Sequence, residues 1–333
     1  MPQTIRVESH ARAGLMGNPS DGYFGKTISL IVRNFLARVE LTESKDVHIV
    51  PSPRDICQFD TLEQLADSAR LFGYHGGVRL LKAAATVFFE HCRQHDIPLA
   101  KCGFTIRYMS TVPERVGMAG SSAIVTACLR ALMKFYSVDI PEPILPNLTL
   151  SVERDELGIP AGLQDRVIQA YGGCVFMDFD RTLMERQGHG QYERIDPALL
   201  PPLYVAYNPN LGEGTEVFHN DIKSRWLRGD PEVVDAMHQW AALAQHARDL
   251  IVAGRGREIA PLVNANFDLR CRIYRIGQGN IDMVETARKT GASAKFTGSG
   301  GAIIGTCEDD AMYQRLEAEM KRKGFCILKP EIV

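Results

Sequence analysis

Residues 103–136 put three patterns in a row, and together they constrain the fold more than any other part of the chain. Residues 103–110 (GFTIRYMS) alternate apolar and polar side chains, which is typical of a half-buried strand. Residues 113–123 (PERVGMAGSSA) then form a glycine-containing turn, and residues 119–136 are apolar enough for a largely buried helix. A strand that leads through such a turn into a buried helix indicates a mixed fold of helices and strands.

The turn itself has the composition of an anion site. Gly117 and Gly120 allow the backbone to turn sharply and to come close to a ligand. The N–H groups that follow lie at a helix N-terminus, where the helix dipole favours an anion such as phosphate. Ser121 and Ser122 add hydroxyl groups and an oxygen ligand suited to Mg²⁺. The alternative is that residues 120–122 only cap a core helix.

Composition excludes several classes of protein. The 333 residues suggest two domains or one large domain, and 45% hydrophobic with 23% charged residues is too apolar for a disordered chain. Lys and Arg total 38 against 40 Asp and Glu, so the net charge is −2. A nearly neutral chain has no overall attraction for nucleic acid or for an anionic membrane, and we expect neither as a partner.

Targeting segments and the cysteine spacing of zinc or redox sites are absent from the sequence. The chain has no uncharged apolar run near the ~18 residues that a membrane span needs. Residues 1–14 lack the apolar core of a secretory signal, and the eight cysteines include no C-x-x-C pair. We therefore expect a cytoplasmic protein in a reducing compartment.

The order of elements predicts an α+β protein with two domains. Strands are expected at residues 5–10, 27–42 (one or two strands), 103–110, 173–179, 203–207 and 302–307. Helices are expected at residues 78–92, 119–136, 231–253, 256–274, 280–290 and 309–323. Residues 181–200 are polar and contain Gly and Pro, which places the boundary between domains 1–185 and 186–333.

Two further loops carry ligand-binding composition. Residues 295–302 (KFTGSGGA) hold three glycines in four positions, which is costly in backbone entropy unless a tight turn or a ligand requires it. Residues 12–27 include Gly-Lys-Thr, but a P-loop needs glycine at position 20, which is serine. Short polar side chains in that loop (Asn18, Ser20 and Asp21) suit the hydroxyl groups of a ligand. The alternatives are an ordinary hairpin turn for the first loop and a surface loop for the second.

A pair of carboxylates follows. Glu153 lies in an expected helix that ends near Gly158, and Asp165 opens or precedes the next one. Two carboxylates that meet across a turn can serve as a metal ligand and a catalytic base. The alternative is a charged helix end with an aspartate cap.

These four elements, in this order, resemble the GHMP kinase superfamily over nearly the whole chain. Within it the sequence is most similar to the glucuronokinases, on residues 17–30 (GNPSDGYFGKTISL), 161–167 (AGLQDRV), 266–270 (NFDLR) and 295–302. Galactokinase-like enzymes have Gly-Glu-His where this chain has Gly17-Asn18-Pro19, which argues against galactose. The loss of an acidic residue at 18 also relieves repulsion with a uronate carboxylate.

The resemblance implies a fold and a reaction. The fold is α+β with two domains, an N-terminal domain like ribosomal protein S5 domain 2 and a C-terminal ferredoxin-like domain, with the active site in the cleft between them. The reaction is transfer of the ATP γ-phosphoryl group, with Mg²⁺, to the anomeric hydroxyl of D-glucuronate. The enzyme would be a cytoplasmic monomer or homodimer of carbohydrate metabolism.

The resemblance also assigns residues. Asp165 would be the base and Arg12 the cation beside the reacting hydroxyl, while Ser122 (or Ser121) and Glu153 would hold Mg²⁺. The phosphates would lie on Gly117, Met118, Ala119, Gly120, Ser121, Ser122 and Ala123. The substrate would be bound by Asn18, Ser20 and Asp21, and closed in by Gly298, Ser299, Gly300 and Gly301.

Two other functions remain open from the sequence. A heptose kinase or another small-molecule GHMP kinase would differ only in the sugar pocket, and a non-catalytic GHMP-fold sensor would keep the fold without the reaction. A uronate carboxylate needs a cation in the site. Lys26, Arg166, Arg270 and Lys295 all lie in the glucuronokinase-like segments, and we expect at least one of them to contact it.

Overall fold

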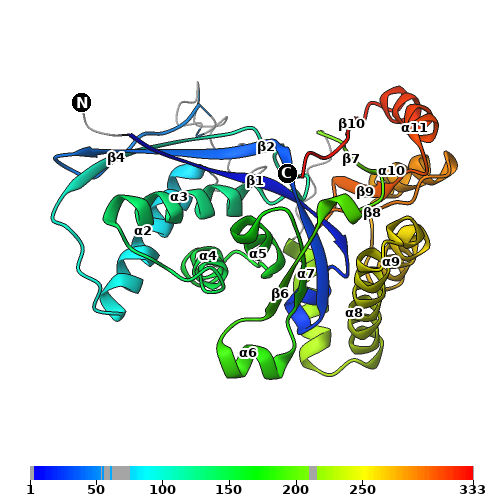
Figure 1. The fold of residues 1–333 in the computed structure, drawn as a ribbon, viewed down its shortest axis with the longest axis horizontal. Coiled ribbons are helices and arrows are strands. Elements are labelled where there is room, and N and C mark those ends of the chain that lie inside the picture. The colour runs from blue at the N-terminus through cyan, green and yellow to red at the C-terminus, as the bar shows by residue number, and fades with distance from the viewer. Residues whose placement is uncertain (1–3, 54, 56–60, 62–75, 210–215, 333) are drawn as a thin grey trace.

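A computed structural model of the protein describes residues 4–53, 55, 61, 76–209 and 216–332. Two sheets organise these residues (Figure 1). The first sheet has six strands: β1 (Thr4–Met16), β2 (Lys26–Ser44), β3 (His48–Ile49), β4 (Gly103–Ser110), β5 (Cys174–Asp178) and β6 (Gln191–Ile195). The second has four: β7 (Leu203–Tyr207), β8 (Lys295–Phe296), β9 (Ala302–Thr306) and β10 (Cys326–Leu328).

The first sheet is built on the long antiparallel pair β1–β2. On the side away from β1, β2 pairs with β4 over residues 37–44 and with β5 over residues 26–30. Residues 27–42 therefore form one strand and not two. The β1–β2 register shifts between His10 and Ala11 and again between Gly14 and Met16. Such irregularities bend a strand and redirect its side chains, and they lie on either side of Arg12.

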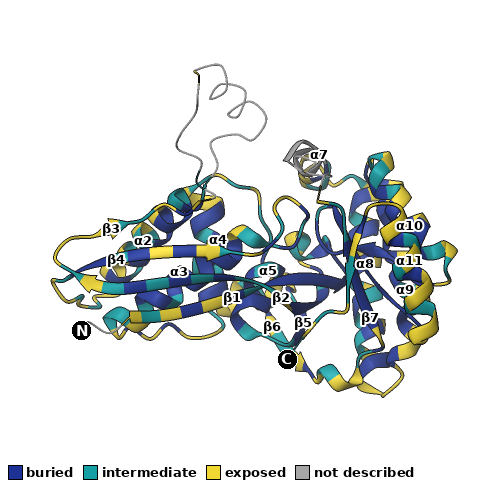
Figure 2. Ribbon diagram, turned by 90° about the horizontal axis from the view of Figure 1, so that it is seen from above, coloured by how far each residue is buried: buried dark blue, intermediate teal, exposed yellow. Residues whose placement is uncertain are grey.

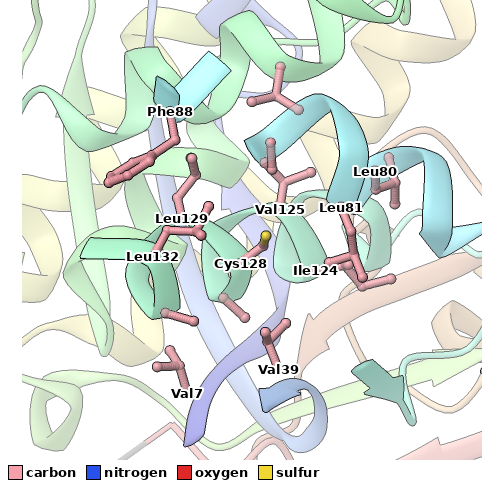
Figure 3. Packing of buried hydrophobic residues seen from close by; sticks show 14 of the residues in the cluster. Val7, Val39, Leu80, Leu81, Phe88, Ile124, Val125, Cys128, Leu129 and Leu132 are labelled. Atoms are coloured by element: carbon pink, nitrogen blue, oxygen red, sulfur yellow. The ribbon is translucent and has the colours of Figure 1, made fainter. Parts of the chain in front are cut away.

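Helices cover one face of this sheet. They are α2 (Gly77–Gln94), α3 (Gly120–Tyr136), α4 (Leu145–Ser151) and α5 (Gln164–Tyr171), all on the same side of β1, β2 and β4 (Figure 1). Figure 3 shows the core that results, in which α3 lies between side chains of α2 on one side and Val7 of β1 and Val39 of β2 on the other. Residues 123–129 of α3 are all buried, because the helix has neighbours on nearly every side.

The second sheet has the topology of a ferredoxin-like domain. Its strand order is β10-β7-β9-β8 and every neighbouring pair is antiparallel, which is the split βαβ arrangement. Between β7 and β8 the chain forms α7 (Glu216–Leu227), α8 (Pro231–Val252), the 3₁₀ turn η4 (Gly256–Ile259), α9 (Ala260–Ile273) and α10 (Gln278–Lys289). Between β9 and β10 it forms α11 (Asp310–Arg322).

One core joins the two sheets. Alternate residues of β7 point to opposite faces, so that Tyr204 packs with α10 and α11 while Val205 packs with α8 and with β1 and β2. Figure 2 shows the same division along the first sheet, which is buried where it meets the second sheet and carries exposed residues at its far end. In β1 the change falls at His10, after which residues 11–16 are all buried.

The α+β fold and most of the expected elements are confirmed, but the boundary moves. The polar segment that suggested a linker is instead α6 (Arg181–Gln187) followed by β6, which pairs with β5 in the first sheet. The change of sheet therefore comes after Ile195 and not after residue 185. The sequence did not indicate α6, β6, α7, β8 or β10, which are short or lack a regular apolar period. No helix among the described residues meets the length and hydropathy that a membrane crossing requires.

The shared packing around α3 makes a direct prediction. Leu129→Ala removes a fully buried side chain and should lower the free energy of unfolding by about 2–5 kcal/mol. Leu227→Ala is the matched control, because that leucine is 74% exposed and the change should cost about 0.5 kcal/mol or less. Urea unfolding of both variants measures the difference, and equal costs would contradict the packing described for α3.

Candidate active site

The turn before α3 leaves an uncapped helix N-terminus. Gly117 has φ +64° and Ala119, the residue before the helix, has φ +61°, both in the left-handed region. No side chain among the described residues caps the helix, which leaves the N–H groups of its first turn open to an external acceptor. An uncapped N-terminus after a glycine turn is a phosphate-binding arrangement, and the simpler expectation of an N-cap is not what the structure contains.

Arg12 connects this turn to two other parts of the chain. Its guanidinium donates from Nη1 to the carbonyl oxygens of Gly117 and Thr297, both at 2.7 Å. Its Nε donates to Oδ1 of Asp165 at 2.5 Å. The Arg12 side chain is only 5% exposed, so these contacts are made away from bulk water. One residue thus brings β1, the turn before α3, the loop after β8 and the start of α5 to the same point.

Asp165 is held in its ionised form. Burial by itself would raise the pKa of this carboxyl, but the Arg12 and Arg166 guanidinium groups lower the pKa below its ordinary value. Arg166 also donates to Oδ2 of Asp165 at 3.3 Å. An ionised carboxylate at a fixed position can accept or orient the proton of a hydroxyl group.

Glu153 lies opposite the start of α3. It belongs to the π-helical turn η2 (Val152–Glu156) that follows α4, and it is fully buried. Ser121 donates its hydroxyl to Oε1 of Glu153 at 2.7 Å, while Arg166 donates to Oε2 from Nε at 2.9 Å and also from Nη2. Arg166 therefore links the two carboxylates of the site, Glu153 and Asp165.

The two serines of the turn differ in position. Ser122 is fully buried and donates its hydroxyl to the carbonyl of Ala119 at 3.1 Å, so it faces back into its own turn. Ser121 is exposed and meets Glu153. The hydroxyl that accompanies Glu153 is therefore that of Ser121, whereas the sequence had put Ser122 first.

The oxygens of Ser121 and Glu153 fit a magnesium ion. Mg²⁺ takes oxygen ligands, and beside a nucleotide it uses one or two protein carboxylates together with phosphates and waters. No group of three or more His, Cys, Asp or Glu side chains suited to a metal occurs in the part of the chain that the structure describes. One carboxylate and one hydroxyl at the N-terminus of α3 suit an ion that enters with a nucleotide.

The loop after β1 contains η1 (Ser20–Tyr23), and its polar side chains are not equally available. Ser20 is fully buried and donates its hydroxyl to the carbonyl of Lys26 at 3.0 Å. Asn18 is also buried, and its Oδ1 accepts a hydrogen bond from Lys295. Asp21 accepts the backbone N–H of Gln164 at 3.3 Å. Asp21 is therefore the polar side chain of this loop that remains partly exposed next to α5.

Asp21 and Asp165 repel each other. Burial and, to a smaller extent, the neighbouring Asp165 carboxylate raise the pKa of Asp21 to about 6, against smaller opposing effects of the Gln164 N–H, Arg12 and Arg166. The two carboxyl groups thus have pKa values displaced in opposite directions. Such a pair of differently tuned acids is typical of functional sites.

The glycine loop after β8 closes directly onto the turn before α3. A Cβ on Gly298 would lie 2.5 Å from the carbonyl oxygen of Gly117 and 2.8 Å from Nη2 of Arg12. A Cβ on Gly117 would lie 2.7 Å from the carbonyl oxygen of Gly300. The loop is a hairpin connection between β8 and β9, which was the alternative to a ligand-binding loop, and it also packs against the turn before α3.

Two residues of the site had no individual signal in the sequence. Asn266 in α9 accepts the Gly17 N–H at 2.7 Å and donates to the Asn18 carbonyl at 3.3 Å, which fixes the loop after β1. Gln169 in α5 donates to the carbonyls of His10 and Ala119. Each is one buried polar residue in a helix, and a single such residue cannot be distinguished from an exposed one by pattern.

The comparisons with known proteins agree with this geometry. Residues 79–173 match the family model of the GHMP kinases N terminal domain. The chain is 43% identical over 330 residues to Glucuronokinase 1 of Arabidopsis thaliana, covering 97% of this chain and 91% of that protein. It is 23% identical to D-glycero-alpha-D-manno-heptose 7-phosphate kinase of Campylobacter jejuni, over 97% of this chain and 95% of that protein.

A solved structure shares the fold over the same length. The structure of Lactococcus lactis galactokinase complexed with galactose superposes with a TM-score of 0.76 at 17% identity. The superposition covers 99% of this chain and 94% of the galactokinase chain. The two-sheet architecture is therefore that of the galactokinase.

The raised pKa of Asp21 predicts a pH-dependent stability. The stabilising contribution of its neutral form is complete below the ordinary pKa of 3.8 and is lost as the pH rises through about 6. Asp21→Asn removes this loss, so its stability relative to the wild type should increase between pH 5 and pH 8. Urea unfolding across that range measures the difference. Asp139→Asn, at an exposed site, is the control, and a difference that stays constant or falls for Asp21→Asn would contradict the prediction.

Proposed function

This chain belongs to the GHMP kinase family, and on that premise we propose that it transfers the γ-phosphoryl group of ATP to the anomeric hydroxyl of D-glucuronate. The product is D-glucuronate 1-phosphate. The observation that carries the proposal is the full-length similarity to glucuronokinase together with a complete set of the residues that the reaction needs. Arg12, Glu153 and Asp165 are present and connected through hydrogen bonds.

The nucleotide phosphates lie at the N-terminus of α3. Residues 117–123 supply backbone N–H groups and two serine hydroxyls, and the helix dipole favours the negative charge. Ser121 and Glu153 would hold a magnesium ion, which would supply positive charge beside the phosphates. The Gly298–Gly301 loop packs against the same turn, and Gly298 permits this close approach because a Cβ there would lie 2.5 Å from the carbonyl oxygen of Gly117.

Arg12 and Asp165 act at the acceptor hydroxyl. Asp165 orients the hydroxyl and accepts its proton as the oxygen attacks the γ-phosphorus. Arg12 keeps Asp165 ionised and places positive charge beside the transferring group. Phosphoryl transfer depends mainly on positioning and on neutralisation of charge, which an ion pair of this kind supplies.

The sugar ring lies against the loop after β1. Asp21 binds a ring hydroxyl with its partly exposed carboxyl group. Asn18 and Ser20 contribute by holding the loop in shape, because their side chains are already committed to Lys295 and to the Lys26 carbonyl. The intact set of site residues argues against a non-catalytic sensor. A heptose kinase is distinguished from a glucuronokinase by which sugar the protein phosphorylates.

A substrate panel tests the proposal. We expect kcat/KM, measured by coupled ADP release, to be highest for D-glucuronate among D-glucuronate, D-galacturonate, D-glucose, D-galactose and a heptose 7-phosphate. Asp165→Asn in the same assay should retain ATP binding and lose kcat by about 10²–10⁴-fold. A neutral sugar or the heptose phosphate as the best substrate would refute the glucuronate assignment. Wild-type turnover by the Asp165 variant would refute the role of that residue.

The two serines make a separate prediction about magnesium. Ser121→Ala should raise the Mg²⁺ concentration for half-maximal activity by about 10-fold or more, because it removes an oxygen next to Glu153. Ser122→Ala is the matched control and should leave that concentration nearly unchanged, since its hydroxyl faces the Ala119 carbonyl. The reverse order of effects, in a titration of activity with Mg²⁺, would restore Ser122 as the ligand.

A further inference from the structure

Four cations lie in the glucuronokinase-like segments, and two of them are neutralised by carboxylates. Lys26 forms an ion pair with Asp178 at 2.9 Å and donates to the side chain of Gln245. Arg166 is paired with both Glu153 and Asp165. Neither side chain has charge left for a substrate, which leaves Arg270 and Lys295.

Lys295 is buried and already uses its donors. Its ammonium group donates to the carbonyls of Gly14 and Phe296 at 2.6 and 2.8 Å and to Oδ1 of Asn18. An ammonium group has three N–H donors, so all of them are occupied. Burial first, then the charges of Arg270 and Arg12, lower the pKa of Lys295 well below its ordinary value. Lys295 contributes positive potential, but it has no hydrogen bond left for an anion.

Arg270 differs from the other three. Its side chain is 4% exposed, and no Asp or Glu forms an ion pair with it among the residues described. It donates to the carbonyl of Gly298 at 3.1 Å and more weakly to that of Ser299 at 3.5 Å. A guanidinium has five N–H donors, so these two bonds leave donors unused. Burial of a cation without a counter-charge is unfavourable unless an anion binds beside it.

The surroundings place Arg270 next to the site. Its guanidinium carbon lies 4.8 Å from the centre of the Tyr274 ring and 5.3 Å from that of Phe296, which holds the planar group in one orientation. Burial raises the pKa of Tyr274, and the nearby charge of Asp21 raises it as well, to a smaller extent. Gly298, whose carbonyl Arg270 holds, contacts Arg12.

We propose that Arg270 binds the carboxylate of the sugar acid and so determines that this kinase takes a uronate in preference to a neutral sugar. The inference rests on the proposed function and identifies the residue that recognises the charged end of the substrate. A guanidinium forms two parallel hydrogen bonds with a carboxylate, and such charge-assisted bonds are the stronger kind. The fork is fixed by two aromatic rings, so little side-chain freedom is lost on binding.

Rejection of the neutral sugar follows from the same burial. Glucose carries a hydroxymethyl group where glucuronate carries the carboxylate, so it would leave the Arg270 charge unpaired inside the protein. Sites that pair a buried polar group with the substrate discriminate strongly against an analogue that lacks the partner. The positive potential of Lys295 acts in the same direction.

The test compares two substrates in one variant. Arg270→Gln should lower the ratio of kcat/KM for D-glucuronate to kcat/KM for D-glucose by about 10²-fold, chiefly through glucuronate, with the KM for ATP unchanged. Arg270→Lys keeps the charge without the fork and should lower the ratio by an intermediate factor. A residue that only supports the glycine loop would lower both activities together and leave the ratio unchanged, and that result would overturn the proposal.

Arg288→Gln is the matched control. Arg288 also stacks on a ring, that of Phe267 at 5.3 Å, and also donates to backbone carbonyls, but it is paired with Asp268 at 2.6 Å. Its replacement should leave the substrate ratio at the wild-type value. If Arg270→Gln does not fold, as judged by circular dichroism, the ratio in Arg270→Lys decides, and a wild-type ratio there overturns the proposal.

The proposed function and the role of Arg270 can be refuted independently of each other. A wild-type protein that does not phosphorylate glucuronate refutes the proposed function. A wild-type protein that prefers glucuronate, combined with an Arg270 variant that keeps the preference, refutes the role of Arg270 and leaves the function intact.

Discussion

The site depends on the hydrogen bonds that the guanidinium of Arg12 donates. It donates to Asp165 and to the carbonyls of Gly117 and Thr297, and it is almost completely buried. These partners belong to segments that are far apart in the sequence and that come from both sheets. The register shifts on either side of Arg12 in β1 give the strand the local shape that lets one side chain reach all of them.

The distribution of charge follows from the same arrangement. Asp165 stays ionised because two guanidinium groups oppose the effect of its burial, whereas Asp21 is shifted the other way by burial and by Asp165. Arg166 joins Asp165 to Glu153, so the carboxylate that we propose as the base and the one that we propose as a magnesium ligand share one cation. A substitution at one of these groups will therefore change the others, and their effects are not expected to add.

The sequence predicted the long periodic elements and the four motifs, and it was weaker where a result depends on side-chain direction. The strand at 103–110 and the helix that begins at Gly120 agree with the structure almost to the residue. The sequence could not separate Ser121 from Ser122, because helix geometry fixes the angle of about 100° between neighbouring residues but not which of them faces Glu153. The polar segment 181–200 looked like a linker because α6 and β6 are short and half exposed. The sequence could not rank Arg270 among the four cations. Only the folded structure shows that no carboxylate among the described residues pairs with it.

The central claim is that this site places the anomeric hydroxyl of glucuronate between Asp165 and the γ-phosphate. The most direct measurement uses D-glucuronate labelled with ¹³C at the anomeric carbon, incubated with the protein, ATP and Mg²⁺ and followed by ³¹P NMR. If the anomeric hydroxyl is phosphorylated, we expect a new sugar-phosphate signal that is split by coupling to the labelled carbon. A phosphate signal without that coupling, or ADP formed with no sugar phosphate, would contradict it.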